Sequence, residues 1–233
     1  MFWMFVQPSQ IAGDRVTFDG KQSHHLGRVL RVRQGERGVV VAAGREHDVE
    51  VLEIGHRTVV ARTIGQRATT TEPGIAVTLW QAVLPNVDFD NVIVNGTAVG
   101  VRRFVAIQAA RSIARLDDSR SPRWERLIAS AAEQSHRGEL PIATGPMTLE
   151  EALGDELAGS RLLVLDPTAD EPLARAIDAS TDYTVAVGPE GGWTAEEVNL
   201  MQRHGGRRVN LARLILRARL APVIAAAILV QQR

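Results

Sequence analysis

The 233-residue sequence contains no cysteine and only one lysine, Lys21. The lack of cysteine excludes disulfides, zinc–thiolate sites and a thiol nucleophile, and it suits a reducing compartment. Because nearly all of the basic charge is arginine, contacts with phosphates or bases would be planar and bidentate. Basic and acidic side chains balance at 27 each, which excludes a uniformly basic nucleic-acid wrapper but leaves room for a local basic patch.

Long apolar segments are also missing. The longest apolar run, from Leu220 to Val230, is too short to span a bilayer and contains Pro222. The first ten residues lack a basic region and a small-residue cleavage site, so we expect no secretory leader. With 45% hydrophobic residues the chain can still build a sizeable core. We therefore expect a soluble cytoplasmic protein with one large domain or two smaller ones.

Short β-branched segments separated by glycines predict a small β-barrel in the N-terminal part of the chain. The candidate strands are 39–42, 49–52 and 58–61. The segment 65–74, Thr-rich and closed by Pro-Gly, predicts a linker. We place the two domains at residues 1–68 and 74–233.

One N-terminal segment, 23–33, breaks the strand pattern and gathers the arginines Arg28, Arg31 and Arg33, with Arg37 close behind. A basic patch on a small β domain is a candidate phosphate-contacting face. A solvated surface in an arginine-rich chain is the alternative. The adjacent histidines His24 and His25 lack the partner cluster that a metal site needs.

The C-terminal part predicts an α/β fold, because strands alternate with helices there. We expect strands at 75–83, 104–109, 162–165, 184–187 and 208–211, and helices at 87–99, 121–136 and 220–232. This alternation is typical of a mostly parallel sheet covered by helices on both faces.

A glycine-rich turn follows the candidate strand at 184–187. It reads Gly188-Pro189-Glu190-Gly191-Gly192. A helix then opens at Thr194, with Glu197 completing a capping box. Glycine has no Cβ, so a flat or charged ligand could approach the main chain closely, and such turns are where α/β sheets bind ligands. A tight turn that binds nothing is the alternative.

Several other enzyme classes lack their motifs in this sequence. There is no Walker sequence, no Gly-x-Ser-x-Gly elbow and no His/Asp/Glu set with metal-ligand spacing, and the glycine turn comes too late for a dinucleotide fingerprint. What remains is ligand binding by loop backbone with little acid–base machinery. A methyltransferase that uses S-adenosylmethionine fits, because its main task is to align an already reactive donor with an acceptor.

Further segments, taken together with the glycine turn, resemble the conserved motifs of one known protein family. They are His24-His25-Leu26 with the arginines after it, Gln81-Ala82, Gly100-Val101, Arg111-Ser112, Arg123-Trp124, Ala131-Ala132-Glu133-Gln134-Ser135 with Arg137 and Pro141, and Leu211 with Ile215-Leu216-Arg217. The C-terminal two thirds resembles the SPOUT superfamily of knotted methyltransferases. The whole chain resembles the RsmE family, which methylates N3 of a uridine in small-subunit (16S) ribosomal RNA.

The resemblance implies an N-terminal PUA-like barrel that grips RNA, a C-terminal domain with a trefoil knot, and a homodimer without metal or membrane. It implies S-adenosyl-L-methionine as cofactor, held by three loops with the residues Leu165, Gly188, Pro189, Glu190, Gly191, Gly192, Leu211, Ala212, Leu214, Ile215 and Leu216. It implies RNA contacts from His25, Arg28, Arg31, Arg33, Arg111, Gln134, Ser135 and Arg137. For Leu165, Ile215 and Leu216, ordinary core positions are the alternative.

Methylation at N3 requires loss of the weakly acidic uracil N3–H. The expected catalytic residues are Arg217, Glu190 and Arg111. Arg111, Arg137 and Arg217 are the candidates for stabilising the negative charge on the base. Glu190 or Asp90 is the candidate proton acceptor. For Glu190, a role confined to capping the turn is an equally open reading.

The chain departs from the family pattern in four places. Lys-Gly is replaced by Pro85-Asn86, Lys-Ala-Thr-Glu-Leu-Gly by 95–100, and Leu-Gly-x-Arg by 211–214. A carboxylate and a hydroxyl expected near the reaction centre are replaced by Arg219 and Leu220. These changes motivate an alternative, a non-catalytic RNA-binding relative that keeps the fold but has lost turnover. A methyltransferase that acts on another RNA position or substrate is a further alternative.

Overall fold

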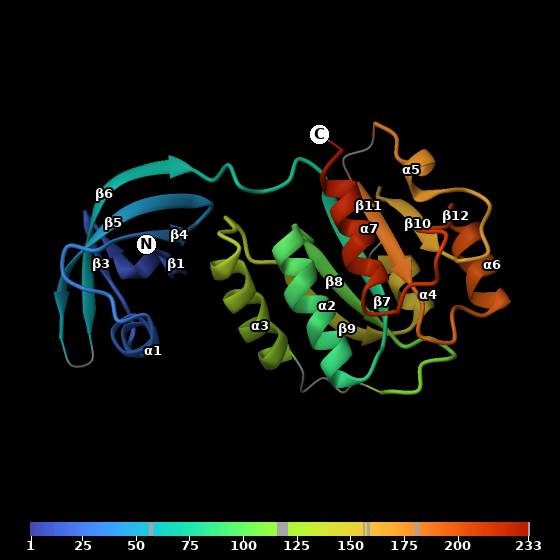
Figure 1. Ribbon diagram of the computed structural model, residues 1–233, viewed down its shortest axis with the longest axis horizontal. Helices are drawn as coiled ribbons and strands as arrows, with labels where there is room; N and C mark the ends of the chain where they lie inside the picture. The colour runs from blue at the N-terminus through green and yellow to red at the C-terminus, as the bar shows by residue number, and fades with distance from the viewer. Residues whose placement is uncertain (56–57, 116–120, 156, 158, 180–181, 233) are drawn as a thin grey trace. The chain divides into compact units, whose positions relative to one another are not determined.

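The computed structural model describes residues 1–55, 58–115, 121–155, 157, 159–179 and 182–232. The chain divides into two compact units, drawn in Figure 1. The first unit contains Met1–Glu72 together with Ala132–Glu139, and the second contains Pro73–Ala131 and Leu140–Arg233. The domain limits expected from the sequence place Ala132–Glu139 in the C-terminal domain. In the structure this segment belongs to the first unit instead.

The first unit is built on a six-stranded sheet with the order β1-β4-β5-β6-β3-β2. Neighbouring strands are antiparallel except for β1 and β4, which are parallel. The strands are β1 Phe2–Phe5, β2 Ile11–Ala12, β3 Arg15–Thr17, β4 Arg37–Ala42, β5 Arg45–Ile54 and β6 Val59–Ala68. Because β6 continues to Ala68, the first part of the expected linker at 65–74 is strand instead. Closure of this sheet into a PUA-like barrel stays a prediction.

The segment that interrupts the strands of the first unit is helical. A short 3-10 turn, η1 (Pro8–Gln10), precedes α1 (Gly20–His24), and α1 leads directly into a π-helical turn, η2 (His25–Leu30). Asp19 caps α1 by accepting hydrogen bonds from the backbone N–H groups of Lys21 and Gln22, both at 2.8 Å. Leu26 is fully buried in the core of this unit and anchors the turn, whereas Arg28, Val29 and Leu30 are exposed.

The second unit contains an entirely parallel six-stranded sheet with the order β12-β10-β11-β7-β8-β9. Its strands are β7 Ala76–Ala82, β8 Arg103–Ile107, β9 Ile142–Met147, β10 Arg161–Leu165, β11 Asp182–Val187 and β12 Arg207–Val209. The predicted parallel α/β sheet is therefore confirmed. The strand β9 was not expected, because its Gly-Pro pair resembles a turn.

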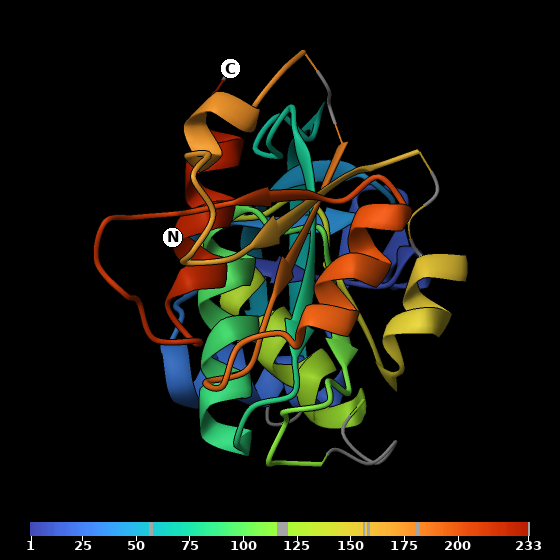
Figure 2. The same cartoon turned by 90° about the vertical axis from the view of Figure 1, so that its right-hand side faces the viewer.

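Helices cover both faces of this sheet, as Figure 2 shows. Alternate strand residues divide between two cores: Leu163 and Val185 pack on one side, Val164 and Ala186 on the other. The helices α2 (Asn86–Val99), α3 (Ser121–Gln134) and α7 (Ala221–Val230) contribute to the first core, and α4 (Leu149–Asp155) and α6 (Ala195–Arg203) to the second. The short α5 (Leu173–Ala176) follows β10.

The buried residues of α2 and α7 pack against one another, and α7 lies on β7 and β11. This places the chain before α7 close to the carboxyl ends of the central strands, where α/β sheets bind ligands. A trefoil knot, in which that chain would thread a loop, stays a prediction. None of the helices in the described ranges has the length and hydrophobicity that crossing a bilayer requires.

Candidate active site

A cavity of about 610 Å³ opens at the carboxyl ends of β10 and β11. Its walls come from the loop after β10, the glycine turn with α6, and the chain leading into α7, together with Arg208 of β12. The lining residues are Leu165, Asp166, Pro167, Thr168, Val187, Gly188, Pro189, Glu190, Gly191, Gly192, Trp193, Thr194, Ala195, Val198, Asn199, Gln202, Arg208, Ile215, Leu216, Ala218 and Ala221. The volume is in the range of pockets that hold small organic cofactors.

The glycine turn forms one wall with its main chain. A Cβ added to Gly188 would lie 3.0 Å from the backbone nitrogen of Trp193, so the turn cannot close as tightly with a larger residue. Gly192 has φ +69°, in the left-handed region that favours glycine, and its N–H donates to the Pro189 carbonyl at 2.8 Å. The turn can thus offer main-chain groups to the cavity at its glycines, and it also brings Pro189 and Glu190 to the cavity lining.

The capping box predicted at the start of α6 is confirmed. The Glu197 carboxylate accepts from the Thr194 N–H at 2.8 Å, and the Thr194 hydroxyl accepts from the Glu197 N–H at 3.2 Å. The second carboxylate oxygen of Glu197 accepts from the Ala110 N–H at 2.8 Å. Glu197 therefore joins the cap of α6 to the loop that follows β8, a tether that the capping pattern alone did not reveal.

Arg111 lies in that same loop and holds the glycine turn from outside the cavity. Its guanidinium donates to the Gly191 carbonyl at 2.8 Å and to the Trp193 carbonyl at 3.4 Å. The side chain is exposed and does not line the cavity. The structure thus gives Arg111 a positioning contact with the glycine turn.

Asp166 follows β10 and brings an ionised carboxylate to the cavity wall. It accepts from the backbone N–H and hydroxyl of Thr168, at 2.8 Å and 2.7 Å, and its ion pair with the Arg208 guanidinium spans 2.7 Å. Burial alone would raise the pKa of Asp166, but the hydrogen bonds from Thr168 and Arg208 outweigh it and hold the pKa below the usual value. Sequence reasoning missed Asp166, Thr168 and Arg208, and their only signal was their place next to strand ends.

The cavity gathers many of the residues expected at the cofactor site but not all of them. Those on its walls are Leu165, Gly188, Pro189, Glu190, Gly191, Gly192, Ile215 and Leu216. Leu211 packs against the core, and Ala212 and Leu214 are exposed, Leu214 by 79%. None of these three is among the lining residues.

The structure does not bring every expected catalytic residue to the cavity. Arg217 is exposed and outside the lining, and its carbonyl accepts from the N–H groups of Leu220 and Ala221 at the start of α7. Asp90 accepts two hydrogen bonds from Arg123, at 2.9 Å and 2.6 Å, and does not line the cavity. The structure therefore does not bring Asp90 to the cavity, and its role as proton acceptor stays a prediction. Of the two carboxylates considered, only Glu190 lies at the cavity.

The residues expected to contact RNA divide into exposed and buried ones. Arg28, Arg31, Arg33 and Gln134 are exposed, and His25 and Ser135 are partly buried. Arg137 differs, because only 5% of it is exposed and its guanidinium forms an ion pair with Glu72 at 2.5 Å. Glu72 also accepts from the Gly138 N–H at 2.9 Å. The structure thus shows Arg137 holding this part of the first unit together, and its predicted RNA contact and charge stabilisation stay predictions.

Comparisons with known proteins indicate the family to which the chain is related. The RNA methyltransferase domain family matches residues 71–230. The ribosomal RNA small subunit methyltransferase E of Synechocystis sp. is 30% identical over 231 residues, which cover 96% of this chain and 75% of that protein. The enzyme of the same name from Mycobacterium bovis is 30% identical over 217 residues, covering 89% and 82% of the two chains.

The chain belongs to the family of ribosomal RNA small subunit methyltransferase E. A ribosomal RNA small subunit methyltransferase E from Neisseria gonorrhoeae, solved bound to S-adenosyl methionine, has the same fold with a TM-score of 0.90 and 26% identity, covering 98% of this chain and 96% of that one. The predicted family is thus confirmed, and S-adenosylmethionine as cofactor is confirmed at the level of the family. Among the described residues there is no His/Cys/Asp/Glu group that could hold a metal ion.

Proposed function

We propose that the protein transfers a methyl group from S-adenosylmethionine to N3 of a uridine in small-subunit ribosomal RNA. The observation that carries the proposal is the cavity of about 610 Å³ between two strand-end loops and the chain before α7. Its relatives named ribosomal RNA small subunit methyltransferase E support the substrate class. The choice of uridine N3 rests on the resemblance described from the sequence.

The cavity residues fit the cofactor by size and by chemistry. Leu165, Val187 and Leu216 offer apolar contacts to a flat ring, and the glycine turn offers main-chain groups that no Cβ shields. S-adenosylmethionine, when bound there, supplies a reactive methyl group on a positively charged sulfur. The protein's part is then to hold donor and acceptor in line and to exclude water.

Two features of this chain prepare the cavity for that task. Arg111 and Glu197 fix the glycine turn and the start of α6 to the loop after β8, so contacts within the protein hold this wall in position. Wall groups that are already in position do not have to be ordered at the moment of reaction. We assign both residues as positioning residues.

Glu190 is the group we assign to accept the uracil N3 proton. It lies on the glycine turn, lines the cavity and has an exposed side chain that an entering base can reach. Asp166 is the other carboxylate of the cavity, and its oxygens are already taken by Thr168 and Arg208. A carboxylate within hydrogen-bonding reach of N3–H is sufficient for general-base assistance.

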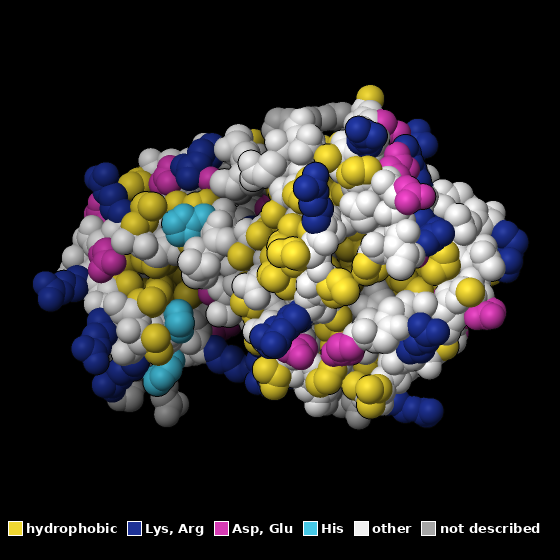
Figure 3. All heavy atoms as spheres, turned by 45° about the vertical axis from the view of Figure 1, so that its right-hand side comes forward, with side chains coloured by type: hydrophobic (Ala, Val, Ile, Leu, Met, Phe, Trp, Pro, Cys, Tyr) yellow, Lys and Arg dark blue, Asp and Glu magenta, His cyan; other side chains and the backbone are white. Residues whose placement is uncertain are grey.

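Two exposed aliphatic side chains beside the cavity support the homodimer that the family resemblance implies. Leu214 and Ile215 are 79% and 87% exposed, which is unusual for large aliphatic residues in one segment. Figure 3 shows hydrophobic side chains gathered on the surface of this unit between scattered basic ones. A dimer would cover such residues, and light scattering on the purified protein tests for it. We propose the cytoplasm as the place where this assembly works.

Nucleoside mass spectrometry tests the proposed reaction. Small ribosomal subunits that lack the modification are incubated with protein and donor, and their RNA is digested to nucleosides. We expect 3-methyluridine to appear in amounts that approach one per subunit. Methylation of another base or ribose would redirect the proposal, and no methylation despite donor binding would contradict it.

A second candidate is an RNA-binding relative without turnover. It is favoured by Arg219, which replaces the expected carboxylate and forms an ion pair with Asp88 at 2.7 Å. Calorimetric titration with S-adenosylmethionine separates the two candidates. Micromolar binding supports the methyltransferase, whereas RNA binding without measurable donor binding supports the second candidate.

A further inference from the structure

Arg208 lies between the cavity and a second hollow of the same unit. This second hollow has a volume of about 530 Å³, and it shares Thr168, Gln202 and Arg208 with the cavity. The two hollows therefore adjoin along these three side chains. A ligand that reaches Arg208 from the cavity meets the second hollow directly beyond it.

The Arg208 guanidinium is held along one side and free along the other. Its Nε donates to Asp166 at 3.0 Å, and its Nη2 donates to the Thr168 hydroxyl at 3.0 Å and lies 2.7 Å from the same Asp166 oxygen. The Thr168 hydroxyl in turn donates to the other Asp166 oxygen at 2.7 Å. Nη1 forms no hydrogen bond with any residue that the structure describes. Two N–H donors on an oriented group are thus left for a ligand.

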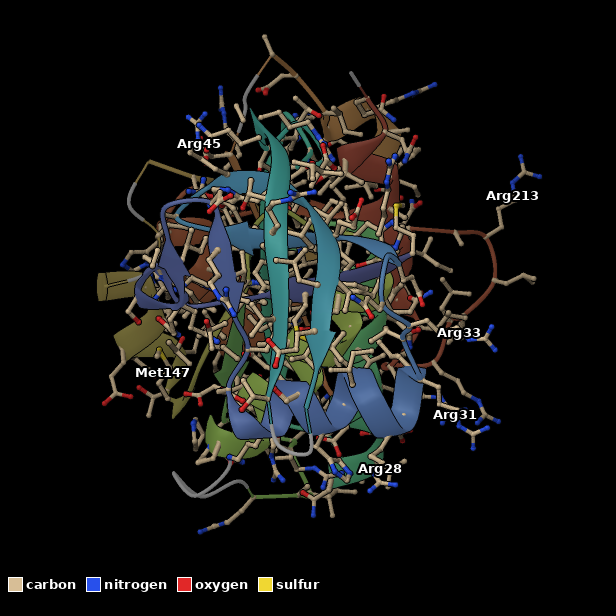
Figure 4. All side chains as sticks on the ribbon, turned by 90° about the vertical axis from the view of Figure 1, so that its left-hand side faces the viewer. Arg28, Arg31, Arg33, Arg45, Met147 and Arg213 are labelled. Atoms are coloured by element: carbon tan, nitrogen blue, oxygen red, sulfur yellow. The ribbon has the colours of Figure 1, made fainter. Side chains whose placement is uncertain are left out.

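Arg208 is also the only basic residue that lines the cavity, within the part of the chain that the structure describes. The chain before α7 carries three more arginines, but none of them is part of the lining. Arg213 extends away from its own segment, as Figure 4 shows, and Arg219 pairs with Asp88. If a basic side chain recognises an anionic group in the cavity, that side chain is Arg208.

The second hollow differs from the cavity in its chemistry. The cavity is mostly apolar, whereas polar and charged side chains line most of the second hollow. Two of them, Arg207 and Glu171, form an ion pair with each other. Asp170 also lines this hollow, is exposed, and forms no ion pair within the described ranges. A guanidinium with free donors and an unpaired carboxylate therefore line the same hollow.

S-adenosylmethionine has two unlike ends. Its adenine is a flat ring, which suits the apolar side chains and the glycine turn of the cavity. Its methionine end carries a carboxylate and an ammonium group on one carbon atom. Such a pair of charges is best met by one cationic and one anionic partner, because charge-assisted hydrogen bonds are stronger than neutral ones.

We propose that Arg208 binds the carboxylate at the methionine end of S-adenosylmethionine through Nη1, and that Asp170 is the partner of the ammonium group. Asp166 and Thr168 are positioning residues, which set the direction of the Arg208 guanidinium. This inference rests on the proposed function in one respect, since it takes S-adenosylmethionine as the ligand of the cavity. It does not depend on which base of the RNA is methylated.

Calorimetric titration of the full-length protein with three ligands tests the proposal. S-adenosylmethionine carries both charged groups, its decarboxylated analogue keeps the ammonium but not the carboxylate, and methylthioadenosine lacks both. We expect Arg208→Met to weaken binding of S-adenosylmethionine about tenfold or more and not to weaken binding of the other two ligands. Arg203→Met removes an exposed arginine that lines neither hollow, so all three affinities should stay within about twofold.

The other two contacts have their own patterns of loss. Asp170→Asn should weaken both ligands that carry the ammonium group about threefold and leave methylthioadenosine unchanged. Thr168→Val removes the hydroxyl that joins Asp166 to Arg208, so it should weaken only S-adenosylmethionine, about fivefold, and Thr168→Ser should restore the binding. A merely structural role of Thr168 would affect the three ligands equally. Unchanged affinities in Asp170→Asn would overturn the ammonium contact.

An equal loss of all three ligands in a folded Arg208→Met variant, checked by thermal unfolding, would overturn the carboxylate contact. Wild type provides a measure that needs no substitution, because it should bind S-adenosylmethionine about tenfold more tightly than the decarboxylated analogue. Equal affinities would overturn the inference even where uridine is methylated, so the proposed function would stand without it. If wild type shows the preference but methylates no uridine, the proposed function fails while this inference stands.

Discussion

The Arg111 guanidinium donates a hydrogen bond to the carbonyl of Gly191, 80 residues later in the chain, over 2.8 Å. This bond joins the loop after β8 to the glycine turn after β11, which are not neighbouring strands, since β7 lies between them. A side chain outside the cavity thus holds one of its walls. The positions of the backbone atoms on that wall depend on this bond.

Arg111→Ala should weaken binding of S-adenosylmethionine about tenfold, since a charge-assisted hydrogen bond to the turn is lost, worth about 1.5 kcal/mol or more. Calorimetric titration measures the change. Arg115→Ala removes another exposed arginine from the same loop and should leave donor affinity unchanged. Equal effects of the two substitutions would mean that charge, and not the bond to Gly191, is what matters.

Glu197→Ala should lower the free energy of unfolding by about 1–2 kcal/mol, because the Glu197 carboxylate no longer accepts from the N–H groups of Thr194, its half of the capping box, and of Ala110. Urea denaturation measures this loss. Glu196→Ala is the matched control, since Glu196 lies in the same helical turn and is exposed. A loss of stability no larger than that of the control would show that the tether contributes nothing.

Glu72→Ala should destabilise the first unit by about 3 kcal/mol, because it leaves the buried Arg137 guanidinium without its carboxylate. The double variant Glu72→Ala with Arg137→Met should lose less, since the uncompensated charge is gone as well. Denaturation followed by the fluorescence of Trp3, with the other tryptophans replaced by Phe, reports on this unit. A double variant less stable than the single one would contradict this account of the pair.

Glu133→Gln should raise stability at neutral pH. Burial raises the pKa of Glu133, and the hydrogen bond from the Phe5 N–H, at 3.3 Å, offsets only part of this. A carboxyl with a raised pKa in the folded state binds its proton more tightly there, so stability falls as the pH rises from the unfolded value, about 4.3, through the folded one.

The advantage of Glu133→Gln should therefore be present above the folded-state pKa. It should vanish below about pH 4, where the Glu133 carboxyl is protonated in both the folded and the unfolded protein. Urea denaturation at a series of pH values measures it. Glu125→Gln, an exposed glutamate on the same helix, should show no such trend. A variant that is less stable than wild type at neutral pH would mean that the ionised carboxylate is held favourably.

Much of the second unit could be predicted from sequence, because its buried strands and its glycine turn have strong local signals. The turn at Gly188 and the cap at Thr194 are set by neighbours within a few residues. What could not be predicted depends on residues far apart in the chain. Arg111 and Gly191, Asp166 and Arg208, and Glu72 and Arg137 meet only after folding, and no periodicity marks such pairs.

The internal ion pairs of Arg137 and Asp90 were not predicted from the sequence, for one physical reason. A charged residue in a motif can contact a ligand or can pair internally, and its type alone does not distinguish the two. Burial decides between them: Arg137 and Asp90 are 5% and 8% exposed, and both are paired. Arg28 carries the same charge as Arg137 but is exposed, and for it the RNA contact stays a prediction.

The most direct test of the account compares wild type with Ala218→Phe, which places a ring inside the cavity. Donor binding by calorimetry and 3-methyluridine formation in small subunits are measured on both proteins, with the fold checked by thermal unfolding. The account predicts that wild type binds the donor and forms 3-methyluridine, and that the folded variant loses both. A folded variant that still methylates the uridine at the wild-type rate would contradict it.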